Sequence, residues 1–236
     1  MGPDNDAAHS KKWMNDFTPG ATAPRGEDFS YVSRTDSANK SYTMQKLRPV
    51  TRITIAISAL LLTSAYFVPL WQILMWAPQY PEGLEMKIWI SDITGDVKII
   101  SALNHYIGMR HIDVSMFPEF KYMIYIVAFL IGVGLLAAIV NRRAALVTYA
   151  ALLVVGGIAA LVDFYLWGYD YGHNLDPNAP IVVPGMAYQP PVIGTKQLLN
   201  FTAFSGPDIG GWIFLVAGLL AIGALVYEIV LSRRKA

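Results

Sequence analysis

The sequence contains no cysteine, and only 15% of its 236 residues are charged. Without thiolates, the chain cannot form disulfides, Cys-ligated zinc sites or iron–sulfur clusters of its own. The charged fraction is too small, and the hydrophobic fraction of 54% too large, for an ordinary soluble domain. A net charge of +1 provides no basic field of the kind that binds nucleic acid, so no nucleic-acid partner is expected.

The first fifty residues lack the long apolar runs of the rest of the chain. They are polar and rich in Gly, Pro, Ser, Asp and Asn. They contain no apolar core of a signal peptide, and they cannot bury enough apolar surface to become ordered. We therefore predict a mostly disordered cytoplasmic tail over residues 1–50, in which His9 is incidental.

Four later runs are apolar over the roughly 20 residues that a helix needs to cross a bilayer. They cover residues 53–75 and about 123–140, 144–167 and 212–231. A buried helix of a soluble protein is seldom apolar on all faces over such a length. The sequence therefore predicts an all-α membrane protein with four transmembrane helices, the first of them kinked at Pro69.

Basic residues mark one side of this predicted bundle. They precede the first run, fill the turn between the second and third, and follow the fourth: Lys46, Arg48, Arg52, Arg142, Arg143, Arg233, Arg234 and Lys235. Because basic segments stay in the cytoplasm, both termini are expected there. Aromatic residues that include Trp71 and Trp167 then mark the outer interface. Residues 76–121 and 168–211 would lie on the outer side.

The predicted spans contain few residues that could bind a metal or carry a proton. No histidine lies inside them, so no haem held by two histidines is expected within the membrane. Asp163 and Glu228 lie near span ends and are expected to reach the interface, which gives poor support for an ion or proton pathway. Small residues recur four apart and predict close helix packing within the chain or against a partner subunit: Ala128 and Gly132, Gly134 and Ala138, Gly156 and Ala160, Ala217 and Ala221.

The first outer segment shows mixed patterns. Residues 84–90 alternate between apolar and other side chains, which predicts a strand. A turn at residues 94–96 would return the chain as a second strand at "VKII" (97–100). Spacing from Ile100 to Ile107 then predicts a short helix that stops at Gly108. We expect a small outer module that contains a short β-element.

The second outer segment is rich in Pro and Gly and has no clear periodicity. A loop of this length in a compact protein is usually functional or disordered, and its aromatic content argues against disorder. Its aromatic side chains are expected to pack on the first outer segment or on a partner: Tyr169, Tyr171, Tyr188, Phe201 and Phe204.

Histidine and methionine gather in these outer segments. The candidate metal ligands are His105, Met109, His111, His173 and Met186. Imidazole and thioether donors without cysteine fit copper best, and His105 and Met109 would share one helix face. A neutral imidazole needs a partner for its second nitrogen, and Asp170, Asp176, Asp113 and Asn104 are candidates for the surrounding polar contacts. The alternative stays open that these histidines satisfy backbone groups and that the methionines fill the core.

Three longer motifs carry a family resemblance. "NHYIGM" (104–109), "YDYGHNLDPNAPI" (169–181) and "PGMAYQPPVIGTKQLLNF" (184–201) resemble a family of small four-helix membrane proteins. Some bacteria encode this family among the accessory genes for nitrous oxide reductase, beside a copper chaperone and a transporter. The resemblance covers about residues 76–212 and leaves the tail aside. The resemblance implies a place in a bacterial inner membrane, outer segments that face the periplasm, and a role in assembly or copper delivery there.

The leading hypothesis is a non-enzymatic accessory protein that handles or delivers copper at the outer face of the membrane, for the maturation of nitrous oxide reductase. The sequence has no Gly-rich phosphate loop with a lysine, no G-x-S-x-G motif and no paired outer carboxylates. The alternative hypothesis is a structural subunit of a membrane respiratory or secretory complex. The copper hypothesis expects His105 and His173 to converge, and the subunit hypothesis expects them to lie apart or to bond the backbone.

Overall fold

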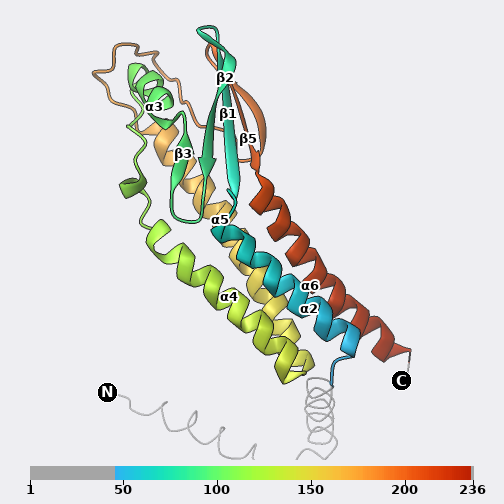
Figure 1. The fold of residues 1–236 in the computed structure, drawn as a ribbon. Coiled ribbons are helices and arrows are strands. Elements are labelled where there is room, and N and C mark those ends of the chain that lie inside the picture. Colours follow the sequence, from blue (N-terminus) through green and yellow to red (C-terminus); the bar gives the residue numbers. More distant parts are fainter. Residues whose placement is uncertain (1–45, 235–236) are drawn as a thin grey trace, which may run out of the picture. The chain divides into compact units, whose positions relative to one another are not determined.

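The structure, a computed structural model, describes residues 46–234, so most of the predicted tail lies outside the described residues. Within this range, four helical segments are long and apolar enough to cross a membrane. They are α2 (Pro49–Leu61) with the 3₁₀ helix η1 (Leu62–Tyr66), α4 (Phe120–Val140), α5 (Arg143–His173) and α6 (Ile209–Arg233). The four run side by side as a bundle (Figure 1). The protein is therefore a multi-pass membrane protein, as its hydropathy predicts.

The first and third spans differ from their predicted bounds. The first ends at Tyr66, and residues 71–75 belong to a strand, so the predicted kink at Pro69 is wrong. Apolar strand residues follow the helix directly, and an apolar run alone does not separate helix from buried strand. In the third span, α5 continues to His173, six residues beyond the predicted end at 167. The second outer segment therefore begins as helix.

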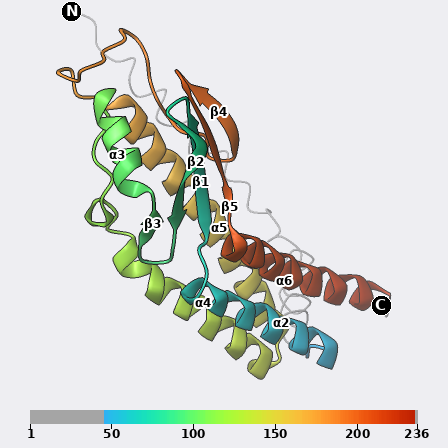
Figure 2. The same ribbon diagram turned by 45° about the horizontal axis from the view of Figure 1, so that its top comes forward.

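Beyond one end of the bundle lies a five-stranded antiparallel sheet (Figures 1 and 2). Its strands are β1 (Trp71–Ala77), β2 (Tyr80–Ile88), β3 (Ile93–Gly95), β4 (Gly194–Leu198) and β5 (Phe201–Pro207), in the spatial order β3-β2-β1-β5-β4. The helix α3 (Val97–Tyr106) follows β3. We call these strands, α3 and their connections, residues 67–118 and 174–208, the sheet module.

The sheet corrects the prediction of an all-α protein with a short β-element. The strand over 84–90 is present as part of β2, but the chain turns at 89–92 rather than at 94–96. The "VKII" segment begins α3 and forms no strand. The predicted stop at Gly108 is confirmed: α3 ends at Tyr106, and Gly108 adopts a φ of +83°. Both β4 and β5 come from the segment that showed no periodicity.

One face of the sheet forms the core of the sheet module. Successive strand residues point to opposite faces, and the buried ones alternate, as Ile73 and Met75 do on β1. Across the β1–β2 pair, Ile73 lies opposite Met86 and Met75 opposite Leu84. The same apolar cluster includes Ile100 of α3 together with residues of α5. The prediction that aromatic side chains of the second outer segment pack on the first is confirmed for Tyr171 and Tyr188, which belong to this cluster.

Small residues and one hydroxyl group hold the bundle together. A Cβ atom on Gly134 of α4 would lie 2.6 Å from the Ala59 Cβ of α2 and 2.7 Å from the Tyr149 ring of α5. The Ser58 hydroxyl donates to the Ala217 carbonyl at 2.7 Å and contacts the Tyr149 hydroxyl at 3.0 Å. Hydrocarbon surrounding a bundle does not drive helices together, so such close contacts and hydrogen bonds must do so.

The other small-residue pairs divide into two groups. Ala138, Ala217 and Ala221 are buried at helix contacts, as predicted for packing within the chain. A Cβ atom added to Gly132 or Gly156, by contrast, would meet no neighbouring atom within 4 Å among the described residues. The helix faces that carry these two glycines are therefore open.

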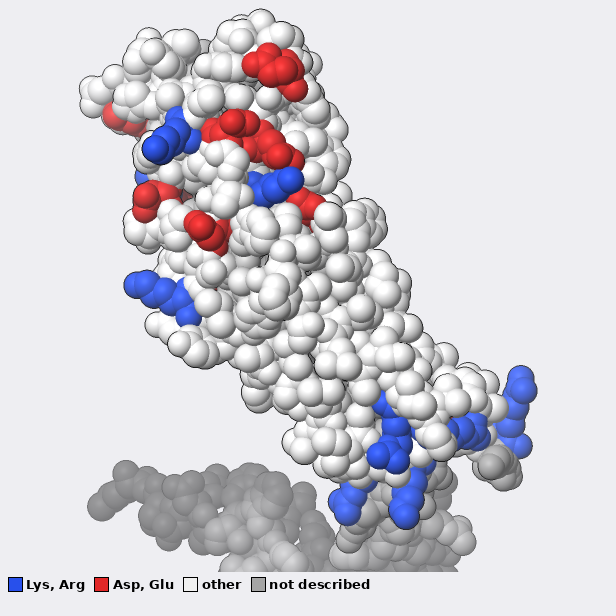
Figure 3. All heavy atoms as spheres, in the orientation of Figure 1, with Lys and Arg blue, Asp and Glu red and all other residues white. Residues whose placement is uncertain are grey.

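Charged side chains gather at the two ends of the helical bundle. On the face that Figure 3 shows, basic groups lie at the bundle end opposite the sheet module, and a mixture with many acidic groups covers the module. Between them lies a surface almost free of charge over the helices. Such a band is what lipid contact requires.

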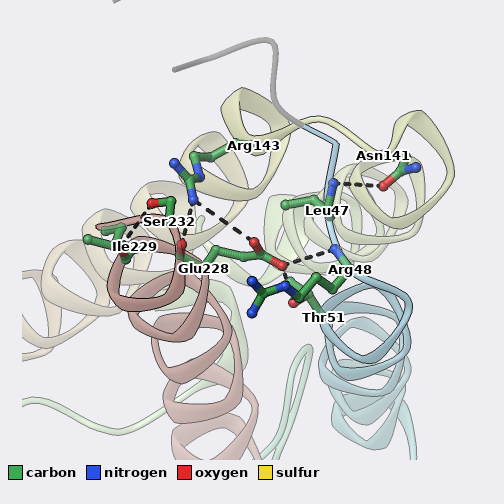
Figure 4. Close-up of polar contacts among 8 residues, drawn as sticks. All are labelled: Leu47, Arg48, Thr51, Asn141, Arg143, Glu228, Ile229 and Ser232. Atoms are coloured by element: carbon green, nitrogen blue, oxygen red, sulfur yellow. Dashed lines mark hydrogen bonds and ion pairs between the residues drawn. The ribbon is translucent and has the colours of Figure 1, made fainter. Parts of the chain in front are cut away.

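Glu228 departs from the prediction that it reaches the interface. Its side chain is buried at the basic end of the bundle, where its Oε1 accepts from the Thr51 hydroxyl at 2.5 Å and from the Arg48 backbone N–H at 3.0 Å (Figure 4). The equally buried Arg143 lies 3.9 Å away and donates to the Glu228 carbonyl oxygen at 2.5 Å. One carboxylate therefore ties α2, α5 and α6. Asp163, in contrast, is exposed on α5.

Replacing Gly134 with valine will destabilise the bundle. The added side chain meets Ala59 and Tyr149 on two neighbouring helices, and overpacking of this kind costs about 1–3 kcal/mol. We expect a lower midpoint of thermal unfolding in detergent. Gly132→Val on the open face of the same helix is the matched control and should leave the midpoint unchanged. Equal effects of the two variants would contradict the close packing at Gly134.

Removing the Glu228 carboxylate will also destabilise the bundle. Glu228→Ala takes a counter-charge away from the buried Arg143, and breaking a buried pair costs about 3–5 kcal/mol. The double variant Glu228→Ala/Arg143→Met should unfold at a higher temperature than Glu228→Ala alone, because the buried cation is removed too. Thermal unfolding of these two variants and of Arg143→Met measures the interaction. If the loss in the double variant equals the sum of the losses in the two single variants, the two side chains do not interact.

Candidate functional site

A small apolar cavity lies inside the sheet module, between the buried face of the sheet, α3 and the end of α5. Its volume is about 40 Å³. Three methionines, four aromatic residues and one amide side chain contribute to its lining: Met75, Met86, Met109, Trp167, Tyr171, Tyr188, Phe201 and Asn104. A space of this size holds a water molecule or an ion but no larger ligand.

Three separate segments bring the methionines to this cavity. Met75 and Met86 lie on the neighbouring strands β1 and β2 and belong to the buried face. Met109 arrives by a different route: after Gly108 the chain reverses, and the Met109 N–H donates to the Asn104 carbonyl at 3.0 Å. All three side chains are at most 9% exposed. The fold therefore brings methionine residues as far apart in the sequence as 75 and 109 to the lining of one cavity.

Aromatic rings form the wall on the side of α5. Trp167 stacks on Tyr171 with ring centroids 4.8 Å apart and contacts Phe117 at 5.0 Å. Phe164 continues the series toward Trp71 at the start of β1. This aromatic cluster joins the helix to the sheet and gives the cavity a stiff boundary.

A polar network closes the end of the cavity wall. The Tyr171 hydroxyl accepts from the Asn104 amide at 3.0 Å and donates to the Arg110 carbonyl at 2.7 Å. The Arg110 guanidinium in turn pairs with Asp170, which also accepts from Asn174. These contacts hold the end of α3 against the end of α5.

The Tyr188 hydroxyl, unlike that of Tyr171, makes no hydrogen bond within the described residues. The Tyr188 side chain is 1% exposed and lines the cavity. A buried hydroxyl without a partner costs about 1–3 kcal/mol. A water molecule or a ligand in the adjacent cavity would remove that cost.

The predicted histidine ligands lie on the surface. His105, His111 and His173 are all exposed. The His173 Nδ1 lies 2.8 Å from the Tyr169 carbonyl oxygen, and the two rings stack at 3.9 Å. Because a carbonyl only accepts, Nδ1 carries a proton, and in the neutral imidazole Nε2 then keeps its lone pair. His173 thus has the tautomer and fixed orientation of a metal-binding imidazole, and a backbone carbonyl supplies what a carboxylate was expected to supply.

These histidines belong to two segments that lie side by side. The Asp176 N–H donates to the Gly108 carbonyl at 2.8 Å, and the Ile181 N–H donates to the Tyr106 carbonyl at 2.9 Å. Even so, nowhere in the part of the chain that the structure describes do three or more His, Asp or Glu side chains form a group able to hold a metal ion. A metal site within these residues would therefore depend on other donors, such as thioether sulfur.

The other predicted site residues have structural contacts. Met109 is buried while His105 is exposed, so the two do not share a face, because the helix ends between them. Met186 is 40% exposed on a loop. The predicted polar partners of the histidines are engaged elsewhere: Asp170 with Arg110, Asn104 with Tyr171, Asp176 with the Asn178 N–H, and Asp113 with the Ser115 N–H.

Asp113 illustrates how such a contact fixes a charge. Hydrogen bonds from Ser115 lower the pKa of the Asp113 carboxyl below its usual range. The group therefore stays ionised at neutral pH and caps the short helix η2 (Val114–Met116).

Met75, Met86 and Tyr188 were not predicted as site residues. Met75 was assigned to the first span, and Met86 was counted only as a strand residue. The alternation along 84–90 did carry a signal for Met86, because it placed that residue on the same face as Leu84. No signal in the sequence joins either methionine to Met109.

A scan of the chain against protein-family models and a search of curated proteins both found no match. The family resemblance of the three motifs therefore stays an expectation from the sequence.

Two tyrosine substitutions will compare how much the hydroxyl groups of Tyr171 and Tyr188 contribute to the free energy of unfolding. Tyr171→Phe removes two buried hydrogen bonds and should lower the free energy of unfolding by about 1–3 kcal/mol. Tyr188→Phe removes a hydroxyl with no partner among the described residues and should leave the free energy unchanged or raise it. Thermal unfolding in detergent, followed by tryptophan fluorescence, measures both. A marked loss in Tyr188→Phe would reveal an ordered bonding partner in the cavity.

Proposed function

We propose that this protein handles copper as Cu(I) at the face of the membrane that bears the sheet module. The observation that carries the proposal is that Met75, Met86 and Met109 all line one small cavity. Thioether sulfur is a soft donor that favours Cu(I) over harder cations. A chain without cysteine has no softer donor to offer.

The aromatic wall suits the same cargo. Trp167 lines the cavity beside the methionines, and an indole face attracts a cation more strongly than other aromatic rings do. The site carries no carboxylate, so it offers little to Zn²⁺ or Ca²⁺, which prefer nitrogen, thiolate or oxygen ligands. Neutral donors hold Cu(I) without the permanence of a thiolate cage, which fits transfer rather than storage.

Surface histidines supply the route by which copper arrives or leaves. In the proposal, the exposed His173 captures the ion through Nε2, and His105 and His111 on the adjoining segment are separate points of contact. Met186, exposed on the loop that follows, is a weaker ligand along the same route. The family resemblance supports delivery toward the maturation of nitrous oxide reductase, in the periplasm of a bacterium with both termini of this chain in the cytoplasm. No catalytic step is assigned to any residue.

Copper binding tests the proposal directly. The protein, purified in detergent and kept reduced, is titrated with Cu(I) against a coloured Cu(I) chelator. We expect stoichiometric binding that is lost in Met75→Leu/Met86→Leu, which keeps the apolar volume but removes two sulfurs. Met116→Leu, outside the cavity lining, is the matched control and should bind as the wild type does. Bound Cu(I) should also quench tryptophan fluorescence, less so in Trp167→Phe.

A further variant distinguishes the capture of copper by the surface histidines from its retention in the cavity. His105→Ala/His173→Ala should slow the transfer of copper from the chelator and leave the final amount bound unchanged. Copper lost in this variant but kept in Met75→Leu/Met86→Leu would place the ion at the surface and refute the cavity site. No copper in any folded form would refute the function.

A second function, a structural subunit that binds a partner protein, has two observations in its favour. His173 bonds the backbone carbonyl of Tyr169, as this alternative expects. The loop between α5 and β4 exposes a run of large apolar side chains at Ile181, Val182 and Val183, which are 39–59% exposed. Exposed apolar patches on otherwise polar surfaces mark interaction sites. Absence of copper, together with co-purification of the untagged protein with a stable membrane complex, would favour this alternative.

A further inference from the structure

The basic end of the bundle carries more positive charge than the described residues neutralise. Lys46, Arg52, Arg142, Arg233 and Arg234 are exposed there. Among the described residues, Glu228 is the carboxylate at these helix ends, and it is buried in its contacts with Thr51, Arg48 and Arg143. On the face that Figure 3 shows, this end displays basic groups and no acidic ones.

Two of these cations are held directly opposite each other. Lys46 and Arg142 form an antiparallel β-bridge, and the next residue, Leu47, donates its N–H to the Asn141 side chain at 3.0 Å (Figure 4). Residues paired in this way project their side chains to the same side, with Cβ atoms about 5 Å apart. Within residues 46–234, neither side chain has a hydrogen-bond or ion-pair partner. Like charges placed directly opposite are destabilising, so an anion bound between the two side chains would stabilise the pair.

The surroundings add to the attraction for an anion. Arg142 is the N-cap of α5, which has no side-chain cap and no acidic residue in its first turn. Negative charge is favoured at such a helix end. Arg52 is fixed nearby, since its Nε donates to the Ala138 carbonyl at 2.8 Å at the end of α4. The bridge therefore sits among further positive potential rather than beside a neutralising group.

We propose that Lys46 and Arg142 bind a phosphate group, and that its bearer is the headgroup of an anionic phospholipid. Lys and Arg are the usual phosphate ligands of proteins. The site lies at the end of four apolar helices, which is the level of the lipid headgroups when those helices cross a bilayer. Basic clusters at this level bind anionic lipids. This site is independent of the proposed copper function.

Lipid-dependent stability tests the site. The protein in a neutral detergent is titrated with phosphatidylglycerol or phosphatidylcholine, and the midpoint of thermal unfolding is followed by tryptophan fluorescence. A ligand that binds the folded state raises this midpoint. We expect phosphatidylglycerol alone to do so, and Lys46→Gln/Arg142→Gln to need on the order of tenfold more of it.

Matched variants make the result decisive. Arg233→Gln/Arg234→Gln removes the same charge from the same end and should respond like the wild type. Arg142→Lys should retain the response, which guards against a loss caused by misfolding of the glutamine variant. Equal weakening in both double variants would reduce the site to a diffuse positive field, and identical effects of the two lipids would exclude it. If sodium phosphate without lipid reproduces the shift and the glutamine variant abolishes it, the phosphate site stands and the bearer is a soluble anion.

Discussion

The pairing of β1 with β5 is the constraint on which the rest of the structure depends. It joins segments about 130 residues apart in the sequence, and its six residue pairs run from Trp71–Pro207 to Trp76–Thr202. The contacts continue below the sheet, where the Asp208 N–H donates to the Leu70 carbonyl and the Gly210 N–H to the Pro69 carbonyl. The strands therefore continue almost directly into η1 and α6. Two membrane helices and the centre of the sheet are held as one unit, so the sheet module cannot turn freely on the bundle.

Different interactions stabilise the two parts of this unit, because the helices lie in lipid and the sheet module lies in water. Between the helices, lipid hydrocarbon is as apolar as the side chains, and contact depends on small residues such as Gly134 and on buried polar groups such as Glu228. In the sheet module, an apolar core excludes water and encloses the methionine cavity. Trp71, Phe164 and Trp167 lie where the two parts meet, and they are part of one aromatic cluster. The proposed copper site and the proposed phosphate site lie at opposite ends of α5, each in the environment that its chemistry needs.

Sequence patterns predicted those features whose cause is local. Length and apolarity are enough to require helices in a bilayer, because every backbone group must find a partner within its own segment. The stop at Gly108 followed from the chemistry of a single residue. Strands β4 and β5 were missed because Pro and Gly hide their short alternation, and because β5 is stabilised by β1, a partner far along the chain. The same reason explains the first span: residues 71–75 are apolar enough for a membrane helix, but cross-strand pairing makes them a strand.

By itself, the sequence determined that the chain crosses a membrane with four helices, that one end is basic, and that any metal site must do without thiolates. Only the tertiary structure decided which donors meet. The histidines that spacing brought together in the sequence lie on the surface, while Met75, Met86 and Met109 come from separate segments to one cavity. The physical reason is the range of the interactions. Bilayer partition and helix stops act over one to twenty residues, whereas strand pairing and core packing join positions that no local pattern connects.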